Sequence, residues 1–115
     1  MEINWNTKEG KLDVKFYYPN IDLMGFKGKP TSSSIIISNA IRENLKGTKI
    51  YHTNSSSTKE SDLYSSVLTL SFRVGKDYKE SNKITLKEVN DILYNIDKDI
   101  QREIRELISH LVKNK

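Results

Sequence analysis

The segment ITLKEVNDILYNIDKDIQREIRELISHL (Ile84–Leu111) determines the fold class that we expect for this chain. Thr85 and Glu88 form the T-x-x-E pattern of a capping box, and Ile84 and Val89 flank it as a hydrophobic staple would. Apolar residues then recur every three or four positions, and neither proline nor glycine interrupts them. This spacing predicts one long amphipathic helix over residues 85–113. Its apolar positions are Leu86, Val89, Leu93, Ile96, Ile100, Ile104, Leu107 and Leu111.

The length of this helix predicts self-association. A helix of about 28 residues would be about 42 Å long, whereas a domain of this size is about 30 Å across. We therefore expect the distal half of the apolar face to be exposed in a monomer, unless the helix bends near Asn95–Asp97. The near-heptad spacing favours pairing with a second copy, which predicts a homodimer or a larger oligomer. The predicted self-association residues are Ile100, Ile104, Leu107, Ile108 and Leu111.

Alternation of apolar and polar residues predicts a sheet of about four strands. LDVKFYY (Leu12–Tyr18) and VLTLSFRV (Val67–Val74) each place every second, apolar side chain on one face. Ile3 and Trp5 alternate in the same way ahead of a turn at Gly10, which predicts an N-terminal hairpin. TKIYHTN (48–54) predicts a further short strand. The polar runs NSSSTKESD (54–62) and GKDYKESN (75–82) predict loops.

The segment from Ser32 to Leu45 has two interpretations. Its β-branched residues are typical of a strand, yet Ile36, Ile37, Ala40, Ile41 and Leu45 lie at helical spacing, and Gly47 follows as a helix terminator. We favour a helix from about residue 33 to 46. The predicted order β-β-α-β-β-α gives one α+β domain over residues 1–115, in which an antiparallel sheet carries a short helix and the long C-terminal helix on one face.

Composition predicts a soluble, cytoplasmic chain. The longest apolar run is Ile35–Ile37, which is far too short to span a bilayer, and the N-terminus lacks the pattern of a secretory signal. The chain has no cysteine, which excludes disulfides and thiolate chemistry. Lys, Asn and Ile have AT-rich codons and are abundant here. We therefore expect a low-GC bacterial source, and a phage or plasmid accessory protein would fit.

The loop GFKGKPTSSS (Gly25–Ser34) is a candidate anion site. The net charge is +4, and residues 1–50 carry +3 of it. Glycines, lysines and hydroxyls ahead of a helix are the groups that phosphate sites use. The P-loop pattern is absent, so an ordinary surface loop is the alternative. The predicted anion-binding residues are Lys27, Gly28, Lys29, Thr31, Ser32, Ser33 and Arg42.

A second candidate site lies on the predicted strands. Lys15, Tyr17 and Arg73 occupy polar positions, where tyrosine could stack on bases and the cations could pair with phosphates. Tyr51, His52 and Tyr64 also lie on or beside predicted strands. The alternative is that tyrosine is present only because it forms strands well.

No residue pattern predicts catalysis. His52 and His110 are isolated, and the nucleophile-elbow pattern G-x-S-x-G is absent. Asp13-Val14-Lys15 is a D-x-K, but no second acid is placed to hold magnesium with it. We therefore expect no enzymatic activity, no metal and no cofactor.

Two function classes remain. The first is a small binding or regulatory protein whose partner is a phosphate-bearing ligand, either a nucleotide or single-stranded nucleic acid. The second is an inhibitor or regulator of another protein, acting through the C-terminal helix or the Leu23–Phe26 segment. The positive charge and the Gly25–Ser34 loop favour the first.

Overall fold

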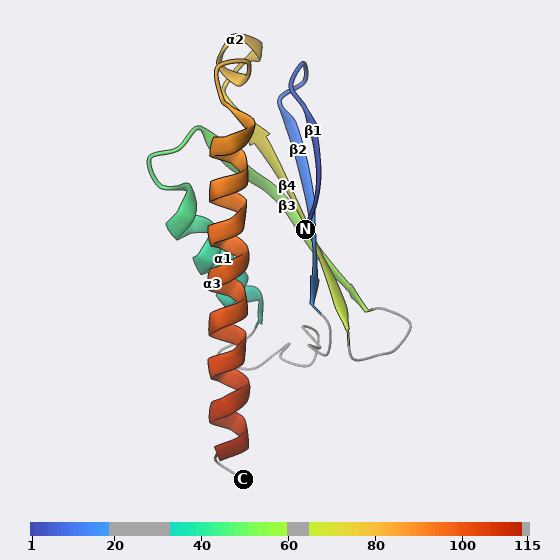
Figure 1. Cartoon of the computed structure of the whole chain (residues 1–115), viewed down its shortest axis with the longest axis vertical. Coiled ribbons are helices and arrows are strands. Elements are labelled where there is room, and N and C mark those ends of the chain that lie inside the picture. Colours follow the sequence, from blue (N-terminus) through green and yellow to red (C-terminus); the bar gives the residue numbers. More distant parts are fainter. Residues whose placement is uncertain (19–32, 60–64, 114–115) are drawn as a thin grey trace.

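The computed structural model describes residues 1–18, 33–59 and 65–113, and it confirms an α+β fold. Four strands form an antiparallel sheet in the order β1-β2-β4-β3. Helices α1 and α3 lie on the same side of that sheet (Figure 1). The elements are β1 (Glu2–Asn6), β2 (Lys11–Tyr18), α1 (Ser33–Leu45), β3 (Ile50–Lys59), β4 (Ser66–Val74), α2 (Tyr78–Ser81) and α3 (Leu86–Lys113).

The two central strands, β2 and β4, behave as their alternation predicts. Leu12 pairs with Phe72, and Val14 pairs with Leu70. These side chains and their neighbours on the same face are buried, while the intervening residues of β2 are exposed. Burying apolar surface is the main favourable term in folding, so this face of the sheet forms the floor of the core.

The helices α1 and α3 cover that floor. The hydroxyl of Thr85 accepts a hydrogen bond of 3.1 Å from the Glu88 amide, which confirms the predicted N-cap of α3. Gly47 has a positive φ of 72° just after α1, as the predicted helix terminator requires. The Asn44 side chain donates a hydrogen bond of 2.8 Å to Oδ2 of Asp99, which ties α1 to α3.

The expected exposure of the distal helix in a monomer is wrong for Ile100 and Ile104. Both side chains are 0% exposed within the single chain. The prediction assumed a compact sphere, but the molecule measures 54 × 30 × 23 Å, and α1 and the sheet extend beside α3 (Figure 1). The helix also continues without a break through Asn95–Asp97. The side chains of Leu107, Ile108 and Leu111 lie outside the described ones, so self-association through them stays a prediction.

The polar run after Asn54 is a strand, and its prediction as a loop is wrong. β3 continues to Lys59 and pairs with β4 along its whole length, with an irregularity in the register between His52 and Asn54. β3 is an edge strand with mostly exposed side chains. Backbone hydrogen bonds to β4 hold this edge strand, and such a ladder does not require apolar alternation.

The connection after β4 contains a short helix, α2, within the run 75–82 that we predicted as a loop. The Asp77 carboxylate accepts a hydrogen bond of 3.0 Å from the Glu80 amide at the start of α2. The buried Ser81 hydroxyl donates one of 3.0 Å to the carbonyl oxygen of Thr7. The Ser81 contact holds α2 against the turn between β1 and β2, at one end of the sheet.

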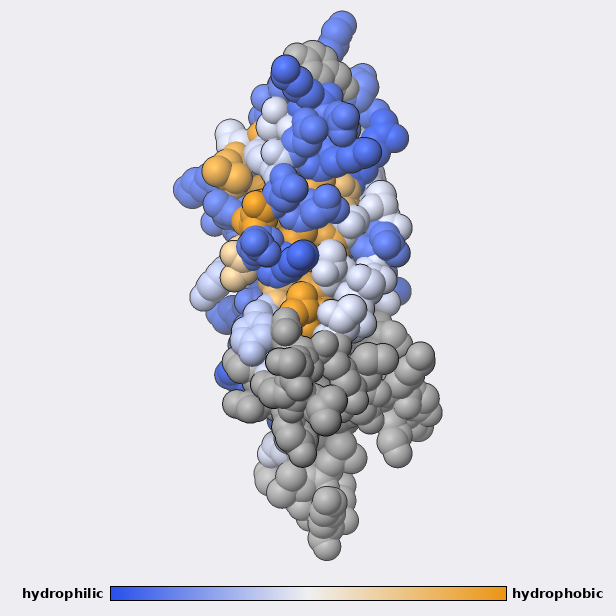
Figure 2. Space-filling model, turned by 90° about the vertical axis from the view of Figure 1, so that its right-hand side faces the viewer, coloured by the Kyte–Doolittle hydropathy of each residue, from blue (hydrophilic) through white to orange (hydrophobic). Residues whose placement is uncertain are grey.

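The side of the molecule on which the β1–β2 hairpin lies has a mixed surface. Figure 2 shows a strip of hydrophobic residues there between hydrophilic ones. Independently of this view, Ile3 and Trp5 of β1 are half-buried and pack against the core. Among the described residues, no helix is long and apolar enough to cross a membrane.

Candidate functional site

Lys15, Tyr17 and Arg73 lie on the same face of the sheet. Their strand neighbours on the other face are buried beneath α1 and α3, so these three side chains point away from the helices. All three are exposed, Tyr17 to 54%. We call this side of the sheet the open face. Its strand residues are Glu2, Asn4, Asn6, Lys11, Asp13, Lys15, Tyr17, Tyr51, Asn54, Ser56, Thr58, Val67, Thr69, Ser71 and Arg73.

The three predicted residues do not form one cluster. Lys15 is the register partner of Thr69, and Tyr17 is the partner of Val67. Arg73 lies four residues further along β4 than Thr69, which is a distance of about 13 Å. The open face therefore has two ends, one at Tyr17 and Lys15 and the other at Arg73.

The Arg73 end contains two further residues that sequence reasoning did not place there. Lys11 is the partner of Arg73 on β2, and Tyr51 is its partner on β3. Neighbouring strands are about 4.8 Å apart, so Lys11, Arg73 and Tyr51 form one row across the sheet. The pairing of distant strands creates this row, and no spacing along the chain signals it.

This row places like charges side by side. Lys11 and Arg73 are directly opposite, an arrangement that is destabilising in a sheet. Lys11 is only partly compensated, by an exposed ion pair of 3.7 Å with Glu9. The Arg73 guanidinium donates to the backbone carbonyl of Lys76 and makes no ion pair within the described part of the chain. An anion bound between the two cations would relieve their repulsion.

The Tyr17 end is a shallow depression. Tyr17 and Lys15 line it together with Met1, Glu2 and Val67. Glu2 is the register partner of Lys15, yet the two form no ion pair in the described residues. The other acid on this face, Asp13, accepts a hydrogen bond of 2.7 Å from the Ser71 hydroxyl. The open face thus carries three cations, two acids and two exposed tyrosines, since Tyr51 is 39% exposed.

The predicted anion loop lies mostly outside the described residues. The predicted loop residues outside the described ranges are Lys27, Gly28, Lys29, Thr31 and Ser32. The Leu23–Phe26 segment and Tyr64 also lie outside these ranges. Ser33 is the first residue of α1. Arg42 is exposed on α1, across the sheet from the open face, and donates a hydrogen bond to Oδ1 of Asn39. The structure therefore does not bring Arg42 together with Lys15 or Arg73.

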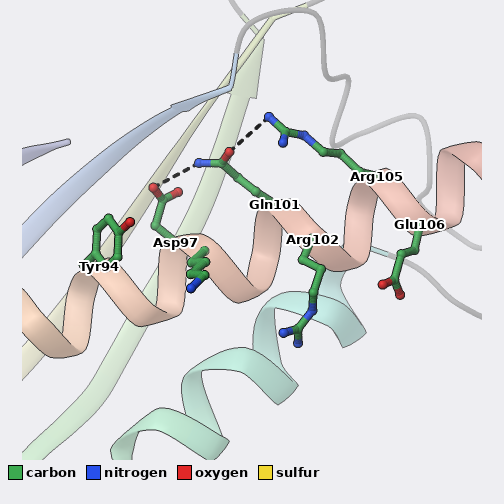
Figure 3. A pocket seen from close by; sticks show the side chains of 7 residues that line it. Tyr94, Asp97, Gln101, Arg102, Arg105 and Glu106 are labelled. Carbon is green, nitrogen blue, oxygen red and sulfur yellow. Dashed lines mark hydrogen bonds between the residues drawn. The ribbon is translucent and has the colours of Figure 1, made fainter.

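A polar groove along α3 is a weaker candidate. Figure 3 shows Gln101 between Asp97 and Arg105, joined to them by hydrogen bonds of 3.0 and 3.4 Å. The Tyr18 hydroxyl donates a hydrogen bond of 3.0 Å to Asp97 from the end of β2. Arg102, which also lines the groove, pairs with Asp99 and Glu103. Asp97, Gln101, Arg102 and Arg105 thus contact other side chains of the chain, and the Tyr18–Asp97 contact joins the sheet to the helix.

The described residues contain no arrangement that suggests catalysis. Nε2 of His52 lies 3.0 Å from the carbonyl oxygen of Asn54, and the ring lies beside Phe72. Within the described ranges, no three His, Cys, Asp or Glu side chains are grouped to hold a metal ion. The side chain of His110 lies outside them.

Comparison of the chain with protein-family models, with curated proteins and with solved structures finds no match. The chemistry of the open face is therefore the basis for assigning a function.

Proposed function

We propose that this protein is a small, non-enzymatic binding module that takes up single-stranded nucleic acid on the open face of its sheet. The observation that carries the proposal is the presence of two exposed tyrosines, Tyr17 and Tyr51, on one face with Lys15 and Arg73. Aromatic rings stack on unpaired bases of any sequence, and cations pair with the phosphates between them. We also propose, from composition, that the protein is cytoplasmic and is a phage or plasmid accessory protein.

A single strand fits this face better than a duplex does. In a double helix the base faces are stacked inside and cannot meet a tyrosine ring, whereas a single strand can splay its bases out. The net charge of +4 supports association with a polyanion, although it is modest. We therefore expect moderate affinity with little preference for sequence.

Binding is tested with fluorescently labelled octathymidylate, by anisotropy at several salt concentrations. Each phosphate contact on a single strand contributes about −0.7 to the slope of log affinity against log salt. Removing two cations in Lys15→Ala/Arg73→Ala should weaken binding and make the slope shallower by about 1.4.

The matched control is Lys87→Ala/Lys98→Ala, which removes the same charge from exposed positions on α3. This control should bind nearly as the unchanged protein does. Equal weakening in both double variants would mean that only net charge matters, and the open face would then not be the site.

The protein-binding alternative has less support. It drew on an exposed apolar face of α3, but Ile100 and Ile104 are buried within the chain. Leu23–Phe26 lies outside the described residues, so that part of the alternative stays a prediction.

A further inference from the structure

We infer that the open face holds two separate subsites, which one nucleic-acid strand must bridge to bind fully. This inference rests on the proposed function and adds to it the path and length of the bound strand. The first subsite is the row of Lys11, Arg73 and Tyr51. The second is the depression at Lys15 and Tyr17.

The first subsite combines a phosphate position with a stacking platform. Two cations on neighbouring strands face each other, and Tyr51 lies beside Arg73 on the next strand. A phosphate between Lys11 and Arg73 would remove a like-charge repulsion, while the attached base reaches the Tyr51 ring.

The second subsite has one ring, Tyr17, and one lysine, Lys15, with the acid Glu2 beside them. Tyr17 lies two residues beyond Lys15 on the same face of β2, so the ring and the ammonium group are neighbours. Lys15 makes no ion pair within the described residues, which leaves it free for a phosphate. The surrounding depression gives the base a partly enclosed position.

The separation of the subsites follows from the register. Tyr17 is opposite Val67 and Tyr51 is opposite Arg73, so the two tyrosines are six residues apart along β4 and two strands apart across it. This corresponds to about 20 Å along the strands and about 10 Å across them, or about 22 Å in all. Uncharged Ser, Thr and Asn side chains occupy most of the face between them.

This distance sets a minimum length for the ligand. Stacked nucleotides advance by about 3.4 Å each, so about six steps separate the two rings, and fewer if the strand is extended. A trinucleotide can therefore occupy one subsite only, whereas an octanucleotide can occupy both. Linking two weak contacts in one ligand raises affinity strongly, because the second contact forms within the complex.

The test is a length series of oligothymidylates of three, five, eight and twelve nucleotides, with affinities measured by competition against labelled octamer. We expect affinity to rise at least tenfold from three to eight nucleotides and less than threefold from eight to twelve. Tyr17→Ala and Tyr51→Ala should each weaken octamer binding at least fivefold. The two variants cannot both weaken trimer binding fivefold, because a trimer that loses one subsite still binds at the other.

Two controls separate stacking from folding. Tyr94 is 61% exposed on α3, away from the open face, and Tyr94→Ala should leave octamer affinity unchanged. Tyr51→Phe keeps the ring and should retain octamer binding. Circular dichroism of each variant establishes that the fold is intact.

The outcomes distinguish the two proposals. If no oligomer binds at any length, the proposed function is wrong and the two subsites fall with it. If trimer and octamer bind equally and only one tyrosine matters, single-strand binding stands and the second subsite is refuted. A steep dependence on length together with effects of both tyrosines supports both proposals.

Discussion

The Tyr18 hydroxyl donates a hydrogen bond of 3.0 Å to Oδ1 of Asp97, and so joins the end of β2 to the middle of α3. Tyr18 is 1% exposed, and its burial, together with the charge of Asp97, raises the pKa of its phenol above the ordinary value of about 10. The folded state therefore favours the neutral phenol over the charged phenolate. This contact should make a measurable, pH-dependent contribution to stability.

Tyr18→Phe should lower the free energy of unfolding by about 1.5–3 kcal/mol at pH 7, the range for a hydrogen bond to a charged group. Above pH 10 the unfolded chain loses the Tyr18 proton while the folded chain keeps it. Stability should therefore fall as pH rises, and Tyr18→Phe should reduce that fall by up to about 1.4 kcal/mol per pH unit. Urea unfolding between pH 7 and 11 measures both effects. Tyr17→Phe, on the exposed side of the same strand, should change neither, and equal profiles for both variants would contradict the assignment.

Ile100→Ala should destabilise the monomer itself. The side chain is fully buried within one chain, so its truncation leaves a cavity and should cost about 2–5 kcal/mol. Urea unfolding followed by fluorescence measures this loss, and light scattering on the same samples records the mass. Leu86→Ala, at a site that is 55% exposed, should stay within about 0.5 kcal/mol. If Ile100→Ala changes the mass without lowering stability, Ile100 lies at a subunit interface and not in the core of one chain.

Gly75→Ala should cost more than Gly47→Ala, although both glycines have a positive φ, of 79° and 72°. A Cβ at Gly47 meets nothing within 4 Å, so only the backbone strain of about 1–2 kcal/mol applies. A Cβ at Gly75 would lie 2.7 Å from the Ser81 amide nitrogen, and overpacking of this kind adds about 1–3 kcal/mol. Thermal unfolding of the two variants compares them directly. Equal losses would mean that α2 can shift away freely.

The sequence predicted those elements that have a local signature in the order of apolar and polar residues. The capping box and the three-to-four spacing located α3, and strict alternation located β2 and β4 with the correct buried faces. The predicted strand at β3 ended too early, at residue 54, because residues 54–58 carry no apolar alternation. An edge strand can be ordered by the backbone of its neighbour alone, and that contribution leaves no trace in hydrophobicity.

The candidate site could be predicted only in part for a related reason. Lys15, Tyr17 and Arg73 sit at polar positions of strands with clear alternation, so a shared face could be expected. Lys11 and Tyr51 join Arg73 through the register of three strands, one of which includes the irregularity after His52. Register depends on long-range packing, and one residue of slip would move every side chain to the other face.

Binding at the open face is tested most directly by titrating isotope-labelled protein with octathymidylate and following the backbone amides by nuclear magnetic resonance. We expect the largest shifts at Lys11, Lys15, Tyr17, Tyr51 and Arg73, with the exposed residues of α3 around Tyr94 unchanged. Shifts confined to α1 or α3, or none at millimolar oligonucleotide, would contradict the claim that the open face binds single-stranded nucleic acid.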